Sequence, residues 1–350
     1  MISNIINLKY KRRMLAFFFC VVGFNSLFSQ KLDSASFDLQ LSIIDSMDLH
    51  GDNGYVDYID SIDSLYLLSP YQQAHLKIIK GEYYSNKSNY DKAIPLFTQA
   101  SKILKENFGE NHPQHISSIN KLALNYYYIG EFEESLSVFT DIKNILKVKF
   151  GDEHPEYTSC LNNVASLYIK IADYNKAEPL LIEALNTRKK TLGEYNTFYL
   201  TSLSNLASLY HSMGQYEKAK PLLINAKYIS HQVRGENHPD HAGTLNNLAI
   251  IHESLSEYNK AEPLLLRARN IQKDVNGVMH PEYATCLKNL ADLYMKMDQY
   301  DKAEDLFIES KKIRKEVLGV RHPGYAAILN SLAKLYKAKG EYAKAEPLYI

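Results

Sequence analysis

The sequence predicts an all-α protein, built as a solenoid of antiparallel helix pairs stacked one on the next. Three observations support this fold class: a period of 42 residues that never slips, apolar residues at helical spacing inside each period, and a turn residue at each expected helix end. A fixed period of this size is typical of a stacked array and not of a single globular core. One aromatic position marks the period along the chain: Tyr90, Phe132, Tyr174, Tyr216, Tyr258, Tyr300 and Tyr342.

Each period predicts two helices joined by a short turn, as residues 154–193 illustrate. His154 and Pro155 precede the first helix, because proline suits a first turn in which its missing amide would have no partner. A second helix should begin near Tyr174 and stop at Gly193, since glycine is favoured directly after a helix. Both helices carry an apolar stripe at helical spacing: Leu161, Val164, Ala165 and Tyr168 on the first, and Ala177, Leu180, Leu181 and Ala184 on the second.

Small residues recur where two helices are expected to cross. Ala165 has alanine counterparts one or more periods away, at Ala123, Ala207, Ala249, Ala291 and Ala333. A methyl group at a crossing lets two helix axes approach to the short end of roughly 8–10 Å. The larger residues of the period then fill the space on either side.

This pattern resembles the tetratricopeptide repeat over about residues 74–350. The 42-residue length, the segment Leu245 to Ala249 (LNNLA), the YNKAEPLL segment and the closing Leu-Gly and His-Pro pairs resemble the variant found in kinesin light chains and their bacterial relatives. The resemblance implies a right-handed superhelix in which the first helix of each pair lines a concave groove. It also implies that the groove binds a peptide or a partner protein.

The chain divides into three expected segments. Residues 1–29 resemble a secretory signal peptide, with a basic region followed by the apolar run 14–24, which is short for a spanning helix. Residues 30–73 are helical by pattern but off the repeat, with a turn at Asp52-Asn53-Gly54, and we interpret them as a helical cap or a degenerate repeat. Residues 74–350 form the solenoid, six complete units and a truncated seventh.

The two chain ends leave alternatives open. A cleaved leader would place the protein outside the cytoplasm, in the periplasm or beyond the cell, whereas an uncleaved one would anchor it to a membrane. At the other end the seventh unit stops inside its second helix, so we expect the natural sequence to continue past Ile350. Bacterial arrays that this one resembles are often followed by a caspase-like protease domain of the CHAT type.

Composition argues against several functions. Lys and Arg total 40, as do Asp and Glu, so no net charge favours nucleic acid or a membrane surface beyond the leader. No phosphate-binding loop, paired-cysteine zinc motif or catalytic arrangement occurs, so we expect no cofactor, no metal and no enzymatic activity. Cys160 and Cys286 share one repeat position three units apart, too far for the roughly 7 Å that a disulfide allows. We therefore expect both to be unpaired.

Five histidines precede a proline at the 42-residue period, and we expect them to cap helices rather than to bind a metal: His112, His154, His238, His280 and His322. In the fourth unit Asn196 and Thr197 replace the His-Pro pair. Because these residues occupy equivalent turns of different units, they cannot converge on one ion.

One arrangement is a candidate binding site. On the first helix of four consecutive units, asparagine holds the same position: Asn163, Asn205, Asn247 and Asn289. An amide offers donors and an acceptor, so a row of them can hold the backbone of an extended peptide; in the family that the chain resembles, asparagines at this place contact bound peptide. Neighbouring positions could add selectivity: Asn162, Asn246, Lys288 and Asn330. Lys121 and Ser331 interrupt the row at its ends.

The asparagines have a second possible role, which is to bond the adjacent repeat and hold its spacing. For the whole chain the leading hypothesis is an exported scaffold that binds a peptide or a partner protein in its groove. The alternatives are a recognition arm of a longer protein with a C-terminal effector, and an assembly protein whose solenoid ends associate. Partner identity and oligomeric state do not follow from the sequence.

Overall fold

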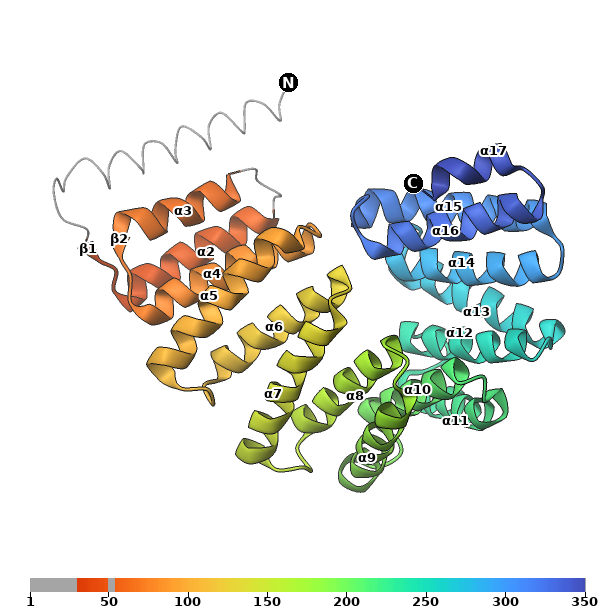
Figure 1. Cartoon of the computed structure of the whole chain (residues 1–350), viewed down its shortest axis with the longest axis horizontal. Coiled ribbons are helices and arrows are strands. Elements are labelled where there is room, and N and C mark those ends of the chain that lie inside the picture. Colours follow the sequence, from red (N-terminus) through yellow and green to blue (C-terminus); the bar gives the residue numbers. More distant parts are fainter. Residues whose placement is uncertain (1–29, 50–53, 350) are drawn as a thin grey trace. The chain divides into compact units, whose positions relative to one another are not determined.

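The computed structural model describes residues 30–49 and 54–349, and in these residues the all-α prediction is confirmed. Sixteen helices, α2 to α17, follow one another as sequential pairs, with two strands of two residues each (Figure 1). The expected signal peptide, 1–29, and most of the expected turn at Asp52 and Asn53 lie outside the described residues. The chain forms two compact units, Met1–Lys80 and Gly81–Ile350.

The first unit contains two helices and a small parallel strand pair. Helices α2 (Ser34–Leu49) and α3 (Tyr55–Leu65) are the pair that the pattern predicts. Strands β1 (Gln30–Lys31) and β2 (Tyr66–Leu67) pair in parallel, Gln30 opposite Tyr66, which the helical pattern does not predict. Phe37, Ile44, Ile59 and Ile62 are at most 4% exposed and form the apolar contact between the helices. The unit ends within α4 (Pro70–Asn86).

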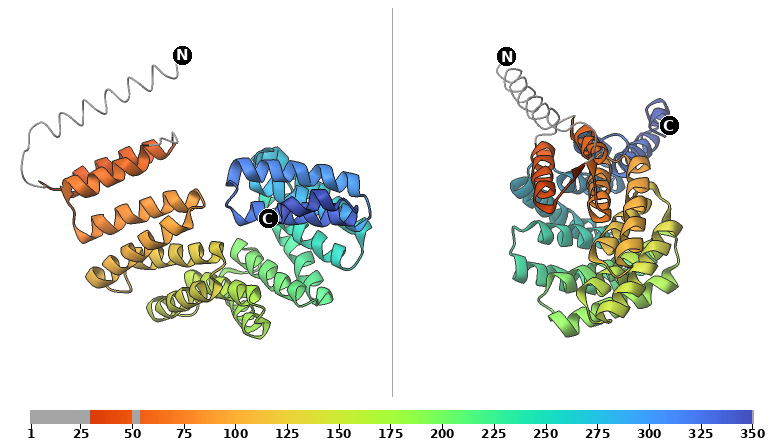
Figure 2. Two further views of the ribbon diagram at one scale, coloured as in Figure 1. Left: turned by 45° about the horizontal axis from the view of Figure 1, so that its top comes forward. Right: turned by 90° about the vertical axis from the view of Figure 1, so that its left-hand side faces the viewer.

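The second unit is a succession of antiparallel helix pairs (Figure 2). The first helix of each pair is even-numbered: α6 (Pro113–Ile129), α8 (Pro155–Lys170), α10 (Thr197–Ser212), α12 (Pro239–Ser254), α14 (Pro281–Lys296) and α16 (Pro323–Ala338). The second is odd-numbered: α5 (Tyr90–Phe108, paired with α4), α7 (Phe132–Phe150), α9 (Tyr174–Leu192), α11 (Tyr216–Arg234), α13 (Tyr258–Asn276), α15 (Tyr300–Leu318) and α17 (Tyr342–Ala345), which a 3₁₀ turn, η1 (Glu346–Leu348), continues.

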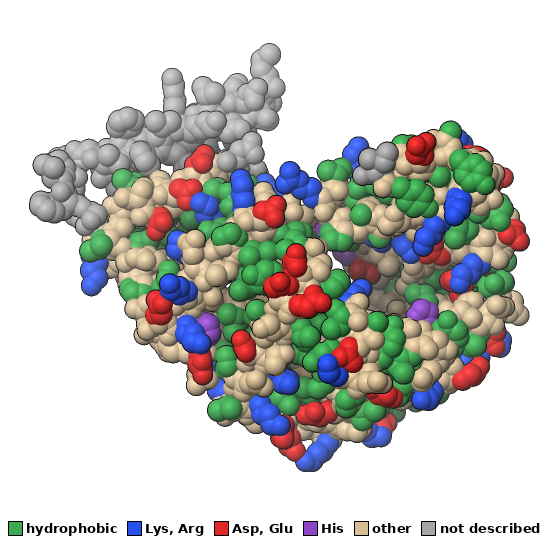
Figure 3. Space-filling view, viewed as in Figure 1, with side chains coloured by type: hydrophobic (Ala, Val, Ile, Leu, Met, Phe, Trp, Pro, Cys, Tyr) green, Lys and Arg blue, Asp and Glu red, His purple; other side chains and the backbone are tan. Residues whose placement is uncertain are grey.

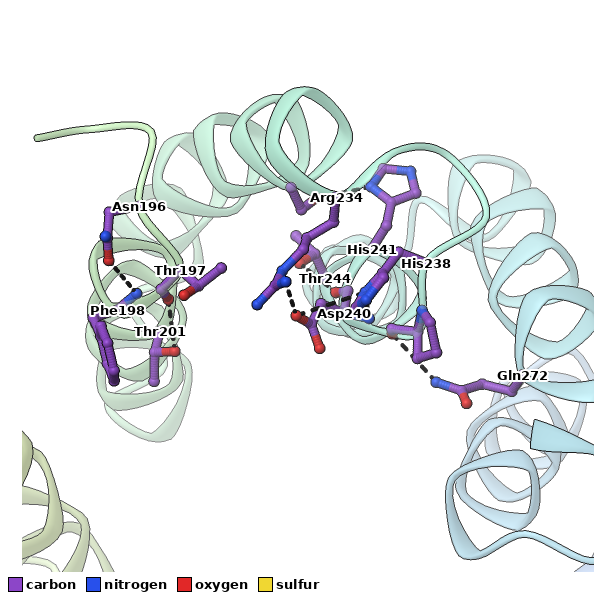
Figure 4. A network of polar contacts seen from close by, with 12 residues as sticks. Asn196, Thr197, Phe198, Thr201, Arg234, His238, Asp240, His241, Thr244 and Gln272 are labelled. Carbon is purple, nitrogen blue, oxygen red and sulfur yellow. Dashed lines mark hydrogen bonds and ion pairs between the residues drawn. The ribbon is translucent and has the colours of Figure 1, made fainter. Parts of the chain in front are cut away.

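Side-chain caps begin the even-numbered helices, as the sequence predicts. In all five His-Pro units the histidine ring accepts a hydrogen bond from the backbone N–H two residues later, for example from Glu156 to His154 Nδ1 at 3.3 Å. Asn196 does the same in the fourth unit, accepting from the N–H of Phe198 at 2.8 Å (Figure 4). Each cap satisfies one of the donors that a helix start leaves unpaired.

The turn between the two helices of each pair needs a residue with a left-handed backbone conformation. Gly130, Gly214 and Gly340 supply it in three units with φ between +71° and +87°, and Ala172 adopts φ 61° in a fourth. An alanine in this region is strained, because its Cβ crowds the following carbonyl. The hydrogen bonds from the N–H groups of Ala172 and Asp173 back to α8 hold the turn in place.

The expected alanine crossings are buried. Ala165, Ala207, Ala249 and Ala291 are each 0% exposed, and so are Ala177 and Ala219 on the second helices. Tyrosines then join one unit to the next: the Tyr210 hydroxyl donates to Glu178 at 2.9 Å, and equivalent bonds join Tyr294 to Glu262 and Tyr336 to Glu304. The abundant tyrosines therefore pack their rings between helices and bond at their polar tips.

The even-numbered helices form the inner side of the second unit. From α8 to α16, each contacts the even-numbered helix of the next unit directly as well as its own partner, and the contacts between successive odd-numbered helices are sparser. A stack that is tighter along one edge curves toward that edge. The row of asparagines, which lies on even-numbered helices, consequently belongs to the inner wall.

Candidate functional site

The four asparagines of the predicted row lie on α8, α10, α12 and α14, and all four side chains are half-buried. Each precedes a buried core residue, Val164 after Asn163 and Leu248 after Asn247, for instance. Because the core residue points between helices, the preceding asparagine lies at the edge of the helix contact. The row thus repeats at one place on four successive even-numbered helices, partly open to solvent.

One member of the row is bonded to the preceding unit. The side-chain Nδ2 of Asn205 donates to Oδ1 of Asn162 at 3.0 Å, joining α10 to α8. Asn162 is 5% exposed, and its own Nδ2 donates to the Thr158 carbonyl at 2.9 Å. Asn205 and Asn162 therefore bond adjacent repeats to each other, which is the second role that the sequence suggested for the row.

The other three amides are free within the described part of the chain. Asn163, Asn247 and Asn289 make no side-chain hydrogen bond there, although each is only partly open to solvent. Asn246 is 8% exposed, and its Oδ1 is a buried acceptor without a partner among the described residues. An unmet acceptor in a buried position carries a cost of about 1–3 kcal/mol.

The residues at the ends of the row are engaged differently. Lys121 pairs with Glu82 at 2.6 Å, joining α6 to α4, and Ser331 is buried on α16. Of the neighbouring positions, Lys288 pairs with Asp292 at 2.6 Å, and Asn330 is exposed. The free amides therefore lie on α8, α12 and α14.

Several polar inner-wall contacts were not predicted. His211 Nε2 lies 3.1 Å from the Ser254 hydroxyl, joining α10 to α12, and Lys296 pairs with the largely buried Glu253 at 2.8 Å, joining α12 to α14. Burial holds the pKa of His211 below its usual value, so this imidazole is neutral near pH 7. Each contact joins residues 43 apart, so a search for pairs at one period plus one residue would have found them.

The most unusual polar residue next to these helices is Arg188 of α9, which is 2% exposed. Aligning the units by their period places it in a column with Leu146, Ser230 and Gln272. A cation in this column of mainly uncharged residues is visible in the sequence, although it belongs to no known motif.

Figure 4 shows where the helix starts of the fourth and fifth units lie. Arg234, at the end of α11, pairs with Asp240 at 3.2 Å, and the Nδ1 atom of His238 lies 3.6 Å from the same carboxylate. Gln272 of α13 donates to the Pro239 carbonyl at 3.3 Å. These contacts fix the N-terminal end of α12, next to the Asn196 cap that begins α10.

Reactive chemistry has little support among the described residues. Cys160 and Cys286 are unpaired, which confirms the prediction for these two, and burial raises the pKa of each thiol to about 12. In residues 30–49 and 54–349 no three acidic, histidine or cysteine side chains gather as a metal site would require. No helix in those ranges has the length and apolar character to cross a bilayer. Positive and negative side chains are interspersed on the face drawn in Figure 3.

Capped helix pairs in constant register, joined by alanine crossings and carrying amides on the even-numbered helices, define a helical-repeat solenoid. Two family models, both described as tetratricopeptide repeat, match the chain: one at residues 73–147, 198–274 and 282–349, the other at 158–195. The chain therefore belongs to the tetratricopeptide repeat family. No curated protein matches it in sequence.

Solved structures share the fold at low identity. A variant of nearly identical repeats from a Podospora anserina kinesin light chain is 23% identical, with a TM-score of 0.51 over 59% of this chain and 97% of that one. The apo quorum sensor NprR from B. thuringiensis is 13% identical, with a TM-score of 0.64 over 98% and 92%. The Rap conjugation gene regulator of plasmid pLS20, solved with the Phr* peptide, is 18% identical, with a TM-score of 0.61 over 90% and 88%.

Proposed function

We propose that this chain is a binding scaffold that takes an extended peptide segment of a partner protein along its inner wall, between α8 and α14. The observation that carries the proposal is the set of half-buried amides on α8, α12 and α14 that have no partner among the described residues. Each repeats at the same place in its unit. A peptide in extended form has an N–H and a carbonyl group at regular intervals, which such a set can match.

Two further observations support a binding role. The tetratricopeptide repeat is a scaffold fold, and similar structures include a Rap protein complexed with the competence and sporulation factor and the pLS20 regulator with its Phr* peptide. The binding of these ligands is a property of those proteins. What they contribute here is that a protein of this fold has been solved with a bound peptide.

The test is a selection of random displayed peptides on the purified chain, followed by affinity measurement with a synthetic copy of the best peptide. Replacing both Asn247 and Asn289 by alanine should weaken binding by about tenfold or more, since each lost bond contributes about 0.5–1.5 kcal/mol. The control is Asn186→Ala, which removes an exposed amide from the odd-numbered helix α9. If the control weakens binding as much as the double variant does, the peptide does not lie on the inner wall.

Asn205 separates the two roles of the row. Because its amide bonds Asn162, we expect Asn205→Ala to lower the thermal midpoint, whereas Asn247→Ala should leave it nearly unchanged. Equal loss of stability in both variants would show that the whole row holds the repeats together, and the binding proposal would lose its support.

We also propose, from the basic and apolar leader alone, that the protein is exported. Fractionation of cells that express the full gene, with detection of a tag at the C-terminus of the encoded protein, tests this directly. Recovery of the uncleaved protein in the cytoplasmic fraction would contradict the proposal.

A further inference from the structure

The buried guanidinium of Arg188 lies just behind the inner wall, between α8 and α10. Its Nη2 donates to the Ser159 hydroxyl at 2.8 Å, and its Nε donates to the Thr158 hydroxyl at 3.1 Å. Its Nη1 donates to the Ser202 hydroxyl and to the Phe198 carbonyl, both at 2.9 Å. Every one of these acceptors is neutral.

No carboxylate in the described part of the chain pairs with this charge within 4.0 Å. Burial alone accounts for the lowered pKa of Arg188, about 10, and no acidic side chain offsets it. The ring of Phe198, 5.4 Å from the guanidinium carbon, gives a partial compensation. Arg188 is thus positive near pH 7, desolvated and without a counter-charge, an arrangement that is costly unless something anionic approaches.

The same repeat position three units later provides a comparison. Arg314 of α15 is 8% exposed, donates from Nη2 to the Thr285 hydroxyl at 3.1 Å and from Nη1 to the Gly324 carbonyl at 2.9 Å. Glu282 and Asp292 lie close enough to favour its charged form. The two arginines therefore share their Nη1 and Nη2 contacts, whereas the Nε of Arg314 has no partner among the described residues. Neither guanidinium has a carboxylate within 4.0 Å, but acidic side chains near Arg314 favour its charged form and none does so for Arg188.

The hydroxyl groups in front of the two arginines differ in the same way. Thr285 donates its own hydrogen to the Pro281 carbonyl at 3.0 Å, so its donor is used. Ser159 accepts from Arg188, and its hydrogen has no acceptor in the described residues. A hydroxyl that accepts from a cation becomes a stronger donor. Ser159 is half-buried on α8, one turn before the free amide of Asn163, so both can reach one groove ligand.

We propose that Ser159 and Asn163, backed by the buried charge of Arg188, form a subsite for a carboxylate of the bound peptide. This inference rests on the proposed function and adds to it the chemical class of one ligand group. The carboxylate accepts from the Ser159 hydroxyl and from the Asn163 amide, and it supplies the counter-charge that Arg188 lacks. The interaction is only weakly screened by salt, because the guanidinium is out of contact with water.

The experiment uses the random peptides displayed on phage, selected on the full chain and on three variants: Ser159→Ala, Arg188→Met and Thr285→Ala. The displayed peptides are fused at their C-termini, so only side-chain carboxylates are sampled. On the wild type we expect Asp or Glu to be enriched at one peptide position. In the synthetic peptide, changing that Asp to Asn should weaken binding by about tenfold, as expected for loss of a charged hydrogen bond.

The variants decide which group recognises the carboxylate. In the Ser159→Ala protein the affinities of the Asp and Asn peptides should differ by less than about twofold. In the Thr285→Ala protein they should still differ by about tenfold. Arg188→Met should also remove the difference in affinity between the two peptides. Because this substitution changes a buried residue, the helix content of the Arg188→Met protein is checked first by circular dichroism. If that protein does not fold, Ser159→Ala alone decides the test. A second arm compares free-acid and amidated C-termini of one peptide, and a preference for the free acid that Ser159→Ala abolishes also supports the subsite.

Three results would overturn the proposal. If peptides bind but show no acidic preference in either arm, the carboxylate subsite is wrong and the groove function stands. If the acidic preference survives Ser159→Ala unchanged, the carboxylate is bound elsewhere. If no displayed peptide binds the wild-type chain, both the subsite and the peptide-binding function are refuted.

Discussion

Gly81 offers the sharpest test of the packing, because a single added carbon should conflict with one identified ring. Gly81 lies on α4 at the position that Ala123 and Ala165 hold in the next units. A Cβ placed on it would lie 2.9 Å from two atoms of the Phe97 ring and 3.2 Å from a third. Phe97 is 1% exposed, so its ring has no open space to turn into. We predict that Gly81→Ala destabilises the first pair of the array.

Two opposing terms set the magnitude. Replacing glycine by alanine inside a helix contributes about 1 kcal/mol of stability, and overcrowding a packed site costs about 1–3 kcal/mol. In the wild-type background the clash should exceed the gain, for a net destabilisation of up to about 2 kcal/mol. In a Phe97→Leu background the ring is absent, so Gly81→Ala should stabilise by about 0.5–1 kcal/mol. The pair it would create, alanine opposite leucine, is what the chain uses at Ala165 and Leu181, both 0% exposed.

The assay is urea unfolding of the four proteins of this cycle, followed by circular dichroism, with hydrogen exchange of α4 and α5 as a local measure. Hydrogen exchange is needed because a repeat array can lose an end pair before the rest unfolds. The decisive result is that Gly81→Ala lowers the free energy of unfolding in the wild-type background and raises it in the Phe97→Leu background. If Gly81→Ala stabilises equally in both, the Phe97 ring does not pack against this position and the helix register is wrong.

The remaining predictions concern the thiols, the caps and the tyrosines. Cys160 and Cys286 should resist a thiol reagent in the folded protein and react after unfolding, because both are buried and their pKa values are raised to about 12; rapid labelling of the native protein would contradict this. His154→Ala should cost about 1 kcal/mol in urea unfolding, and His154→Asn should restore most of it, because an asparagine caps the fourth unit. Tyr294 should make the fold sensitive to alkali. Burial, then the bond to Glu262, raise its pKa from 10.0 to about 12, so the unfolded chain loses this proton first and stability falls as pH rises between those values. Tyr294→Phe should flatten that fall in urea midpoints taken at about pH 9 and pH 11.

Features that depend on residues within one unit, and that recur from unit to unit, could be predicted from the sequence. The histidine caps, the left-handed turn at Ala172 and the buried alanine crossings each depend on neighbours within about one period, so spacing alone identifies them. The short strand pair could not be predicted, because Gln30 and Tyr66 are brought together by the fold of α2 and α3 and carry no alternation of their own.

The candidate site could be predicted only in part. The positions of the asparagine row follow from the period, but the stagger between units decides which amide meets a partner. That stagger brings Asn205 to Asn162 and leaves Asn247 free, although both hold the same place in their units. Arg188 was missed for a related reason: its burial depends on the helix start of the following unit, where Phe198 and Ser202 close over it.

The joints between units have a consequence for how the chain reaches and keeps its structure. Each pair touches chiefly the pairs before and after it, so most native interactions join residues fewer than about fifty positions apart in the sequence. Folding can start at any well-formed pair and spread outward in both directions. A destabilising substitution in one pair weakens its interfaces with the two neighbouring pairs and leaves distant pairs intact. We therefore expect such substitutions to cause local unfolding rather than unfolding of the whole chain.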